Sequence, residues 1–284
     1  MLSRRTFIAG LGAFALADSI RVGYAAITWG GDDGRAIREI ADVGFKGIQL
    51  RNTAVARFGG NPRELRDLLA SRDLTLAALS SGNLRIDPSV ERDEIALHTR
   101  HAAFVRDVGG LFLQVIDERP KGRPVVAGDY TRLGRLMSEL GRRTADIGVP
   151  LVYHHHMNSL GEKPSEIDAA LEAADPRHVG VLFDIAHYLQ GGGDPVAAIR
   201  KYRDRIRIVH LKDVRRIDAA PGYEWVELGR GRVDVKGCVA ALREVGFAGW
   251  AIIELDRVPD ATGSPKASAL ANRRYAEQQL GLTV

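Results

Sequence analysis

The stretch GVLFDIAHYLQGGGDPVAAIRKYRDRIRIVHLKD, residues 180–213, decides the fold. Two short β-type runs, Gly180–Asp184 and Ile206–Leu211, enclose a loop of three glycines and a helical pattern over Asp194–Tyr202. Strands that alternate with helical patterns indicate parallel strands joined by crossover helices. The stretch therefore predicts one unit of a parallel α/β fold.

The same unit recurs along the chain from about residue 20. We expect strands over Val22–Thr28, Gly47–Leu50, Thr75–Ser80, Leu111–Val115, Leu151–His155, Gly180–Asp184, Ile206–Leu211 and Trp250–Glu254. Helical patterns include Asp33–Val43, Pro62–Ser71, Arg92–Val108, Tyr130–Ile147, Asp194–Tyr202, Val235–Val245 and a last helix from Ser264-Pro265 to about Leu280. Eight strands, each followed by a helix, match a single (β/α)8 TIM barrel of ~250 residues. An open doubly wound sheet is the alternative, but no Gly-x-Gly-x-x-Gly follows the first strand, which disfavours its dinucleotide-binding form.

The composition excludes several classes of protein. With 45% hydrophobic and 27% charged residues, the chain has enough apolar material for a large core. The formal net charge is +4, and removing Arg4 and Arg5 with a leader leaves +2 (4 minus 2). Nucleic acid is not an expected partner, because the basic residues are scattered and form no stripe. The one cysteine, Cys238, lies in an expected helix and is interpreted as a small buried apolar residue.

The first seventeen residues have the pattern of an export signal. A twin arginine, Arg4-Arg5, precedes an uncharged apolar run over residues 7–17 that ends in the small-x-small sequence Ala15-Leu16-Ala17. The run is too short for a membrane span of ~20 residues. We expect residues 1–17 to be a twin-arginine signal peptide and residues 18–284 to form the barrel, so that the protein is periplasmic or secreted, with no membrane contact beyond the signal. An amphipathic first helix of the domain is the alternative.

Ligand-type residues end four consecutive expected strands. The fifth strand ends in His154-His155-His156, the sixth in Asp184, the seventh in His210 and the eighth in Glu254. The carboxyl ends of barrel strands form the active face. Strand alternation sends His154 and His156 one way and His155 the other. The sequence therefore predicts one divalent metal ion on Asp184, His210, Glu254 and one histidine of the fifth strand, taken as His154 with His156 as the alternative. This donor set suits Mn²⁺, Co²⁺, Mg²⁺ or Zn²⁺.

Other polar and aromatic residues near the strand ends allow two interpretations. Lys212 and Asp213 form a substrate contact, a solvated pair or a loop anchor. Trp29 and Trp225 either stack on a sugar ring or pack in the core. Gln49, at the end of the second strand, is a further candidate substrate contact. We carry Lys212, Gln49 and Trp29 forward as substrate-binding candidates.

The chain resembles the xylose isomerase-like superfamily of sugar phosphate isomerases and epimerases. The resemblance extends from about residue 20 to 280, and three ordered motifs carry it: Asp-x-x-His at 184–187, His-x-Lys-Asp at 210–213 and Leu-Gly-x-Gly at 228–231. It implies a metal-dependent barrel with ligands at Asp184, His210 and Glu254, and His187 on substrate hydroxyls. The family's fourth ligand is a glutamate on the fifth strand, where His154 stands, and Gln49 also replaces what is often a glutamate.

These departures affect the expected reaction. Epimerases of the family use one glutamate on each face of the substrate carbon, and only Glu254 remains here. The run Tyr153-His154-His155-His156-Met157 resembles the inosose dehydratase branch and related keto-glycoside lyases. In those, removal of a proton next to a ketone is followed by loss of a β-oxygen.

We therefore expect a metal-dependent enzyme acting on an unphosphorylated sugar, keto-sugar or cyclitol. Glu254 or His156 removes the proton next to the carbonyl, His187 orients or protonates a hydroxyl, and the outcome is isomerisation, epimerisation or β-elimination. Two alternatives remain: a metal-dependent phosphoesterase or endonuclease-like hydrolase on the same barrel, and a non-catalytic sugar-binding protein. The sequence is compatible with a homo-oligomer and does not establish one.

Overall fold

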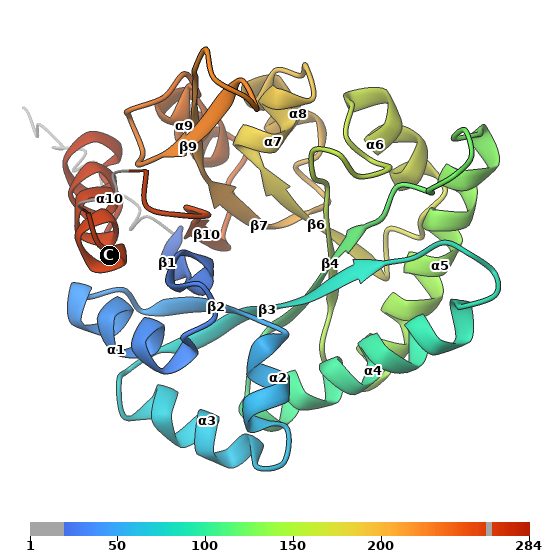
Figure 1. The fold of residues 1–284 in the computed structure, drawn as a ribbon, viewed down its shortest axis with the longest axis horizontal. Coiled ribbons are helices and arrows are strands. Elements are labelled where there is room, and N and C mark those ends of the chain that lie inside the picture. The colour runs from blue at the N-terminus through green and yellow to red at the C-terminus, as the bar shows by residue number, and fades with distance from the viewer. Residues whose placement is uncertain (1–19, 260–262) are drawn as a thin grey trace, which may run out of the picture.

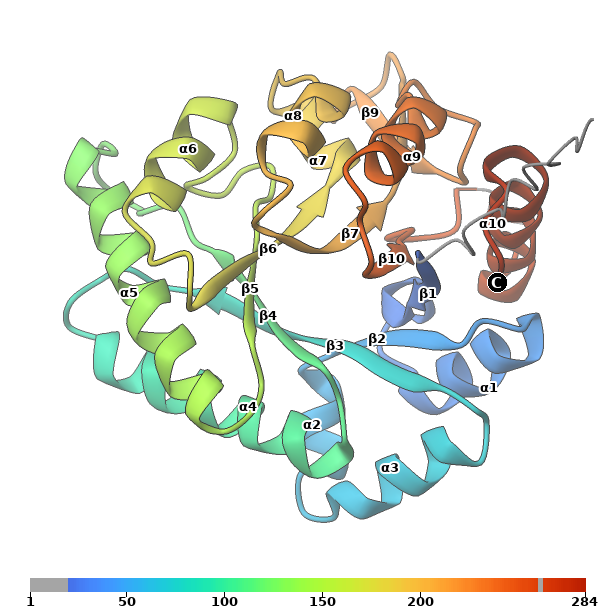
Figure 2. The ribbon, with the colours of Figure 1, turned by 180° about the vertical axis from the view of Figure 1, so that it is seen from behind.

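Eight parallel strands close into a barrel that helices surround, which confirms the predicted single (β/α)8 barrel (Figure 1; Figure 2 shows the opposite side). The computed structural model describes residues 20–259 and 263–284, so the predicted signal segment lies outside the described residues. The strands pair around the barrel in the order β1-β10-β7-β6-β5-β4-β3-β2. Their bounds are β1 Arg21–Ala25, β2 Gly47–Arg51, β3 Thr75–Leu84, β4 Phe112–Asp117, β5 Leu151–His154, β6 Val179–Asp184, β7 Ile206–Leu211 and β10 Trp250–Ile253.

The helices lie outside the barrel because each one buries an apolar stripe against it. In α1 (Asp33–Val43), for example, the buried residues include Ile37, Ile40 and Val43, which share one face at helical spacing. The other helices are α2 Thr53–Phe58, α3 Pro62–Ala70, α4 Glu91–Val108, α5 Ala127–Asp146, α6 Pro164–Glu172, α7 Ile185–Gln190, α8 Pro195–Lys201, α9 Val235–Glu244 and α10 Pro265–Leu280. Within residues 20–259 and 263–284, none of them is long and apolar enough to cross a membrane.

The apolar side chains of the strands form two layers, because successive residues of a strand point alternately into the barrel and out toward the helices. One cluster, the inner layer, consists of Ala25, Ala77, Ala78, Val152, Leu182, Ile208, Trp250 and Ile252. The neighbouring strand residues, such as Tyr153, Phe183 and Val209, belong to the larger cluster that packs on the helices. Because successive side chains of a strand point to opposite faces, the inner layer fills the barrel. This alternation decides which polar residues point into the barrel at the strand ends.

The structure corrects the predicted end of the first strand. We expected a strand over Val22–Thr28, but β1 ends at Ala25 and Ala26–Trp29 forms a 3₁₀ turn. The Thr28 hydroxyl donates to the carbonyl of Leu255 at 2.5 Å, and Gly30 ends the turn with a φ of 63°. A left-handed φ costs glycine little, so the chain turns away from the barrel at this point.

The predicted helix after β7 is present as α9 (Val235–Glu244), but an element that the pattern did not predict precedes it. An antiparallel hairpin of β8 (Asp213–Arg216) and β9 (Tyr223–Val226) stands between β7 and α9. Val214 and Trp225 are buried and opposite each other, whereas Arg215 and Arg216 are exposed. The hairpin brings Trp225 over the strand ends. Two short helices, α2 and α7, are also additions to the predicted pattern.

Candidate metal centre

Strand alternation delivers the predicted ligands to one place. On four neighbouring strands an inner-layer residue is followed, two positions later, by a ligand-type residue: Val152 by His154, Leu182 by Asp184, Ile208 by His210 and Ile252 by Glu254. These strands, β5, β6, β7 and β10, are consecutive around the barrel. The period of two therefore points all four polar side chains at the barrel axis, just above the apolar filling.

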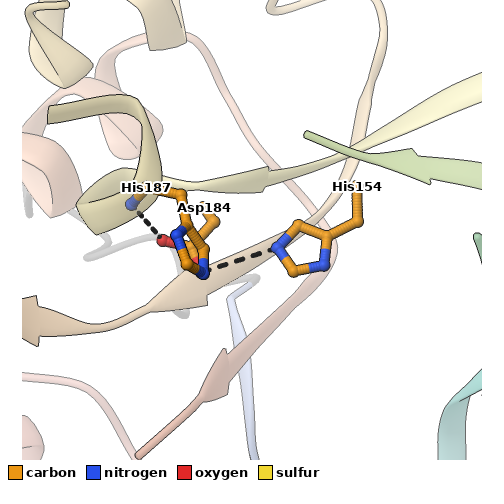
Figure 3. A group of neighbouring side chains, drawn as sticks. All are labelled: His154, Asp184 and His187. Atoms are coloured by element: carbon orange, nitrogen blue, oxygen red, sulfur yellow. Dashed lines mark hydrogen bonds and ion pairs between the residues drawn. The ribbon is translucent and has the colours of Figure 1, made fainter. Parts of the chain in front are cut away.

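These four side chains and His187 form two groups that share Asp184. One group contains His154, Asp184 and His187 (Figure 3), and the other contains Asp184, His210 and Glu254, each with its ligand atoms within 4.8 Å of one another. Asp184 Oδ2 lies 3.4 Å from His210 Nδ1 and 3.6 Å from His154 Nε2. His210 Nδ1 lies 3.5 Å from Glu254 Oε1. Ligand atoms bound tetrahedrally at ~2.1 Å from one metal ion are ~3.4 Å apart, so these separations fit a metal site.

Unpaired polar atoms support the same assignment. His154 Nε2, Asp184 Oδ2 and His210 Nδ1 are all buried and have no hydrogen-bond partner. A buried polar atom without a partner costs ~1–3 kcal/mol, and its presence calls for a bound group that satisfies it. A carboxylate oxygen and at least one imidazole nitrogen that converge in this way fit a divalent cation.

Asp184 is held in place by the helix that follows it. Its Oδ1 accepts hydrogen bonds of 2.8 Å from the backbone N–H groups of Ala186 and His187, at the start of α7. This cap leaves Oδ2 free to face the centre. Burial opposes ionisation of Asp184, but the neighbouring His187, His154 and His210 outweigh it and hold the pKa of the carboxyl well below its ordinary value. Asp184 is therefore a carboxylate, which is the form that binds metals.

Lys212 neutralises the second carboxylate. Its side chain is 1% exposed, and its Nζ lies 2.8 Å from Glu254 Oε1 and 2.5 Å from Asp256 Oδ1. Burial opposes the charge of Glu254, but His210 and Lys212 outweigh it and lower the pKa of Glu254 to about 2. The ammonium also stands 4.4 Å from the centre of the Trp225 ring. Lys212, which was a candidate substrate contact, thus forms internal ion pairs with Glu254 and Asp256 and keeps the Glu254 carboxylate charged.

His155 and His156, the two histidines that follow β5, differ in their orientation and hydrogen bonds. His155 points away from the centre, as predicted, and accepts a hydrogen bond from the backbone N–H of Asp184 at 3.3 Å. His156 contributes its Nδ1 to a 2.7 Å hydrogen bond with the Met157 carbonyl oxygen, and its ring centre lies 3.7 Å from that of His187. A carbonyl oxygen can only accept, so the proton of neutral His156 is on Nδ1 and its Nε2 carries a lone pair. His156 is therefore arranged as a base.

A cavity of about 280 Å³ opens beside the centre. Its lining includes His154, His156 and Glu254, and the remaining residues are Ala25, Ile27, Gln49, Arg51, Asn52, Ser80, Gly82, Asn83, Gln114, Ile116 and Asp256. Small-molecule sites usually measure ~300–1,000 Å³, so this cavity suits a compact ligand. The polar lining from β2, β3 and β4 offers both donors and acceptors, as a molecule with many hydroxyl groups requires.

The structure does not bring every predicted residue to the cavity. The Trp29 indole N–H donates to Glu39 at 2.7 Å and its ring packs edge-on against Tyr24, because the 3₁₀ turn carries it off the strand end. Trp225, the other aromatic candidate, contacts the site instead, with its ring centre 4.9 Å from that of His187. His187 itself is buried, and its Nε2 lies 3.4 Å from the Lys212 ammonium.

Two residues of β4 that the sequence analysis did not select are built into the site. Gln114 lines the cavity and lies 3.1 Å from both Gln49 and His154. Asp117 is buried and accepts hydrogen bonds from the Tyr153 hydroxyl at 2.7 Å and the Gly161 backbone N–H at 2.9 Å, so it anchors the loop that carries His156. A polar residue inside an apolar strand was the only sequence signal for Gln114.

Comparison with known proteins extends these findings. A family model described as a xylose isomerase-like TIM barrel matches residues 37–278. The inosose dehydratase of Lacticaseibacillus casei is 28% identical, over 93% of this chain and 98% of that protein. The IOLI protein with a bound zinc atom has a TM-score of 0.78 at 14% identity, covering 92% of this chain and 98% of that one. The probable 3-DHS dehydratase AsbF of Bacillus anthracis, involved in petrobactin synthesis, has a TM-score of 0.74 at 16% identity, covering 92% of this chain and 100% of that one.

Proposed function

Because the chain belongs to the xylose isomerase-like TIM barrel family, we propose that it is a divalent-metal-dependent dehydratase that removes a proton next to the carbonyl of an unphosphorylated keto-sugar or cyclitol and eliminates a β-hydroxyl. Its relatives and structural neighbours identify it as an enzyme of the sugar isomerase, epimerase or dehydratase kind. The similarity to inosose dehydratases over almost the whole chain favours elimination within this group.

One observation carries the proposal: a histidine with a free Nε2 lines the same cavity as the unpaired ligand atoms of the metal centre. Asp184, His210 and Glu254 would hold the ion, which would polarise the substrate carbonyl and make the neighbouring C–H group more acidic. His156 Nε2 accepts that proton. The β C–O bond then breaks and a C=C bond forms next to the carbonyl. The departing oxygen takes up the proton that His156 carries, so that it leaves as water and His156 is neutral again. Lys212 keeps Glu254 ionised throughout.

The reaction is tested by incubating the purified protein with inososes and keto-sugars in D₂O, with Mn²⁺ or Co²⁺. We expect deuterium next to the carbonyl in recovered substrate, together with an enone product that absorbs in the ultraviolet. His156→Asn should lower turnover at least ~10²-fold, the usual contribution of a positioned base. His178→Asn is the matched control, because His178 precedes β6 at the opposite end of the barrel. Exchange without enone formation would indicate an isomerase or epimerase, and no exchange with any candidate would refute proton abstraction.

We further propose that the N-terminal seventeen residues export the folded enzyme. The twin arginine and the short apolar run support this proposal, and an enzyme outside the cytoplasm would meet few sugar phosphates. Replacing Arg4 and Arg5 together by Lys should shift the protein from the periplasmic to the cytoplasmic fraction. An unchanged distribution would contradict the proposed export.

A further inference from the structure

A chain of side-chain hydrogen bonds joins His154 to His210 behind the metal centre. His210 Nε2 lies 2.8 Å from Gln49 Oε1, Gln49 Nε2 lies 3.1 Å from Gln114 Oε1, and Gln114 Nε2 lies 3.1 Å from His154 Nδ1. All four side chains are buried, at 4% exposure or less. This series of hydrogen bonds links residues of β7, β2, β4 and β5, so it can form only when the barrel is closed. We call it the glutamine relay.

The glutamine relay has a direction. Each glutamine side chain offers one oxygen that only accepts and one NH₂ group that only donates. In the arrangement above, His210 donates to Gln49, Gln49 donates to Gln114, and Gln114 donates to His154. Turning both amides over reverses every bond. Turning only one amide over places two oxygens or two NH₂ groups against each other in a buried position, which costs free energy.

Either direction restricts the two imidazoles. A neutral imidazole has its proton on one nitrogen, and the other nitrogen carries the lone pair. When His210 donates from Nε2, its Nδ1 faces the centre with a lone pair, whereas His154 accepts at Nδ1 and must point an Nε2–H at the centre. The reverse direction exchanges these roles. An imidazolium at either position is disfavoured beside a divalent cation, because like charges repel strongly in a buried site.

We propose that Gln49 and Gln114 are positioning residues that make His210 the imidazole ligand of the metal and leave His154 as an N–H donor facing the cavity. This inference rests on the proposed metal centre. It agrees with the grouping of the ligand atoms, which places His210 with Asp184 and Glu254 and places His154 with Asp184 and His187. His154 thereby becomes a hydrogen-bond donor for a substrate oxygen, rather than the fourth ligand that the sequence predicted.

The relay also pairs His154 with His156. Both line the cavity and come from one strand end, but His156 presents a lone pair because its Nδ1–H is bound to the Met157 carbonyl. His154 presents an N–H because Gln114 donates to its other nitrogen. His156 can therefore accept the substrate proton, while His154 donates a hydrogen bond to the departing oxygen and keeps its own proton. The hydrogen bonds of the two rings thus distinguish the base, His156, from the hydrogen-bond donor, His154.

Metal titration tests which histidine is the ligand. EDTA-treated protein is titrated with Co²⁺, and binding is followed by calorimetry and by the visible spectrum of the bound ion. We expect His154→Ala to change the Kd by less than threefold and to leave the spectrum nearly unchanged, whereas His210→Ala raises the Kd at least a hundredfold. Equal losses in the two variants would overturn the proposal.

A second measurement needs no variant that weakens folding. In zinc-loaded wild-type protein labelled with ¹⁵N, two-bond ¹H–¹⁵N correlations report which nitrogen of each histidine carries the proton. We expect His154 to be protonated at Nε2 and His210 at Nε2, with His210 Nδ1 bound to zinc. Protonation of His154 at Nδ1 would refute the assigned direction. Wild-type protein that binds no metal would refute the metal centre instead, and the same spectrum of metal-free protein would still report the relay.

The variant Gln49→Glu should free His154 from the tautomer that the glutamine relay imposes on it. In Gln49→Glu the new carboxylate only accepts, so His210 and Gln114 both donate to it, and Gln114 then accepts from His154 Nδ1–H. His154 Nε2 becomes a free ligand atom. The added charge alone tightens metal binding, so the informative comparison is a double-mutant cycle: His154→Ala should raise the Kd at least tenfold in the Gln49→Glu background and less than threefold in wild type. Equal effects in both backgrounds would contradict the relay.

Discussion

Replacing Lys212 by Met is expected to destabilise the metal-free protein by ~3–5 kcal/mol. The ammonium is 1% exposed and lies 2.8 Å from Glu254 Oε1 and 2.5 Å from Asp256 Oδ1. At an effective dielectric constant of ~20, two unit charges 2.8 Å apart attract by ~6 kcal/mol, and desolvation offsets part of that attraction. Breaking a buried pair typically costs ~3–5 kcal/mol, because the partner stays buried without compensation. Methionine retains most of the apolar length of lysine, so the loss reports the charge.

Lys201→Met is the matched control. Lys201 Nζ is likewise 2.5 Å from an aspartate, Asp168, and likewise lies near an aromatic ring, that of Tyr202, but its side chain is 53% exposed. Exposed ion pairs contribute ~0–1 kcal/mol, so this variant should remain close to wild type. Both variants are compared by urea unfolding in the presence of EDTA, with the slopes of the transitions checked for equality.

The pH dependence gives the experiment a second readout. Burial lowers the pKa of Lys212, but Glu254, Asp256 and Asp184 outweigh this effect and raise it, so the ammonium stays charged at neutral pH. The pKa of Glu254 is lowered to about 2, so its stabilising contribution is complete above about 4.5 and is lost as the pH falls toward 2. In Lys212→Met the carboxylates can take up protons at higher pH, so the difference from wild type should shrink on acidification. Equal stability losses in the Lys212 and Lys201 variants at pH 7 would refute the importance of burial.

Three further outcomes are expected. A bound metal ion should raise the free energy of unfolding by ~2.7 kcal/mol when its free concentration is a hundred times the Kd. The measurement is thermal unfolding with Mn²⁺ or Co²⁺, compared with unfolding in EDTA. Asp184→Asn should remove this stabilisation, and a stabilisation that persists in the variant would place the metal elsewhere. Asp213→Asn should lower the free energy of unfolding by ~2–3 kcal/mol and alter Trp225 fluorescence. The reason is that the carboxylate accepts four backbone N–H hydrogen bonds of 2.8–3.0 Å in the loop beside the hairpin. An unchanged midpoint of urea unfolding would contradict this anchoring role. Burial, reinforced by the charges of His98 and Arg100, lowers the pKa of His101 to about 4, so the unfolded chain binds this proton at a higher pH than the folded protein does. As the pH falls from 6.5 to 4, the free energy of unfolding should therefore decrease by ~1.4 kcal/mol per pH unit for this group. His101→Gln should reduce the pH slope of stability by about one proton, and an unchanged slope would count against the shift.

Much of the barrel was predictable because its signals are local. The bounds of α1 and β7 match the predicted ranges residue by residue, since a helical stripe and an apolar run are both visible in a short window. The hairpin of β8 and β9 was missed because each strand has four residues and lies where the repeating pattern calls for a helix. The end of β1 was misplaced because a hydrogen bond between Thr28 and Leu255, residues 227 positions apart, decides it.

The sequence by itself determined the fold and the residue types of the site. A period of two along β5, β6, β7 and β10 sets which side chains face the axis, and the parallel order of the strands brings their ends together. These rules placed His154, Asp184, His210 and Glu254 in one region, and the similarity to the xylose isomerase-like family is confirmed.

Only the tertiary structure decided what each of these side chains can do. The proton position of His210 depends on Gln49, 161 residues away, and that of His154 depends on Gln114, 40 residues away. Lys212 is an internal counter-ion rather than a surface charge because Glu254 and Asp256 arrive 42 and 44 residues later. Hydrogen bonds and ion pairs act over a few ångströms, so the roles within the site depend on which residues the closed barrel brings into contact.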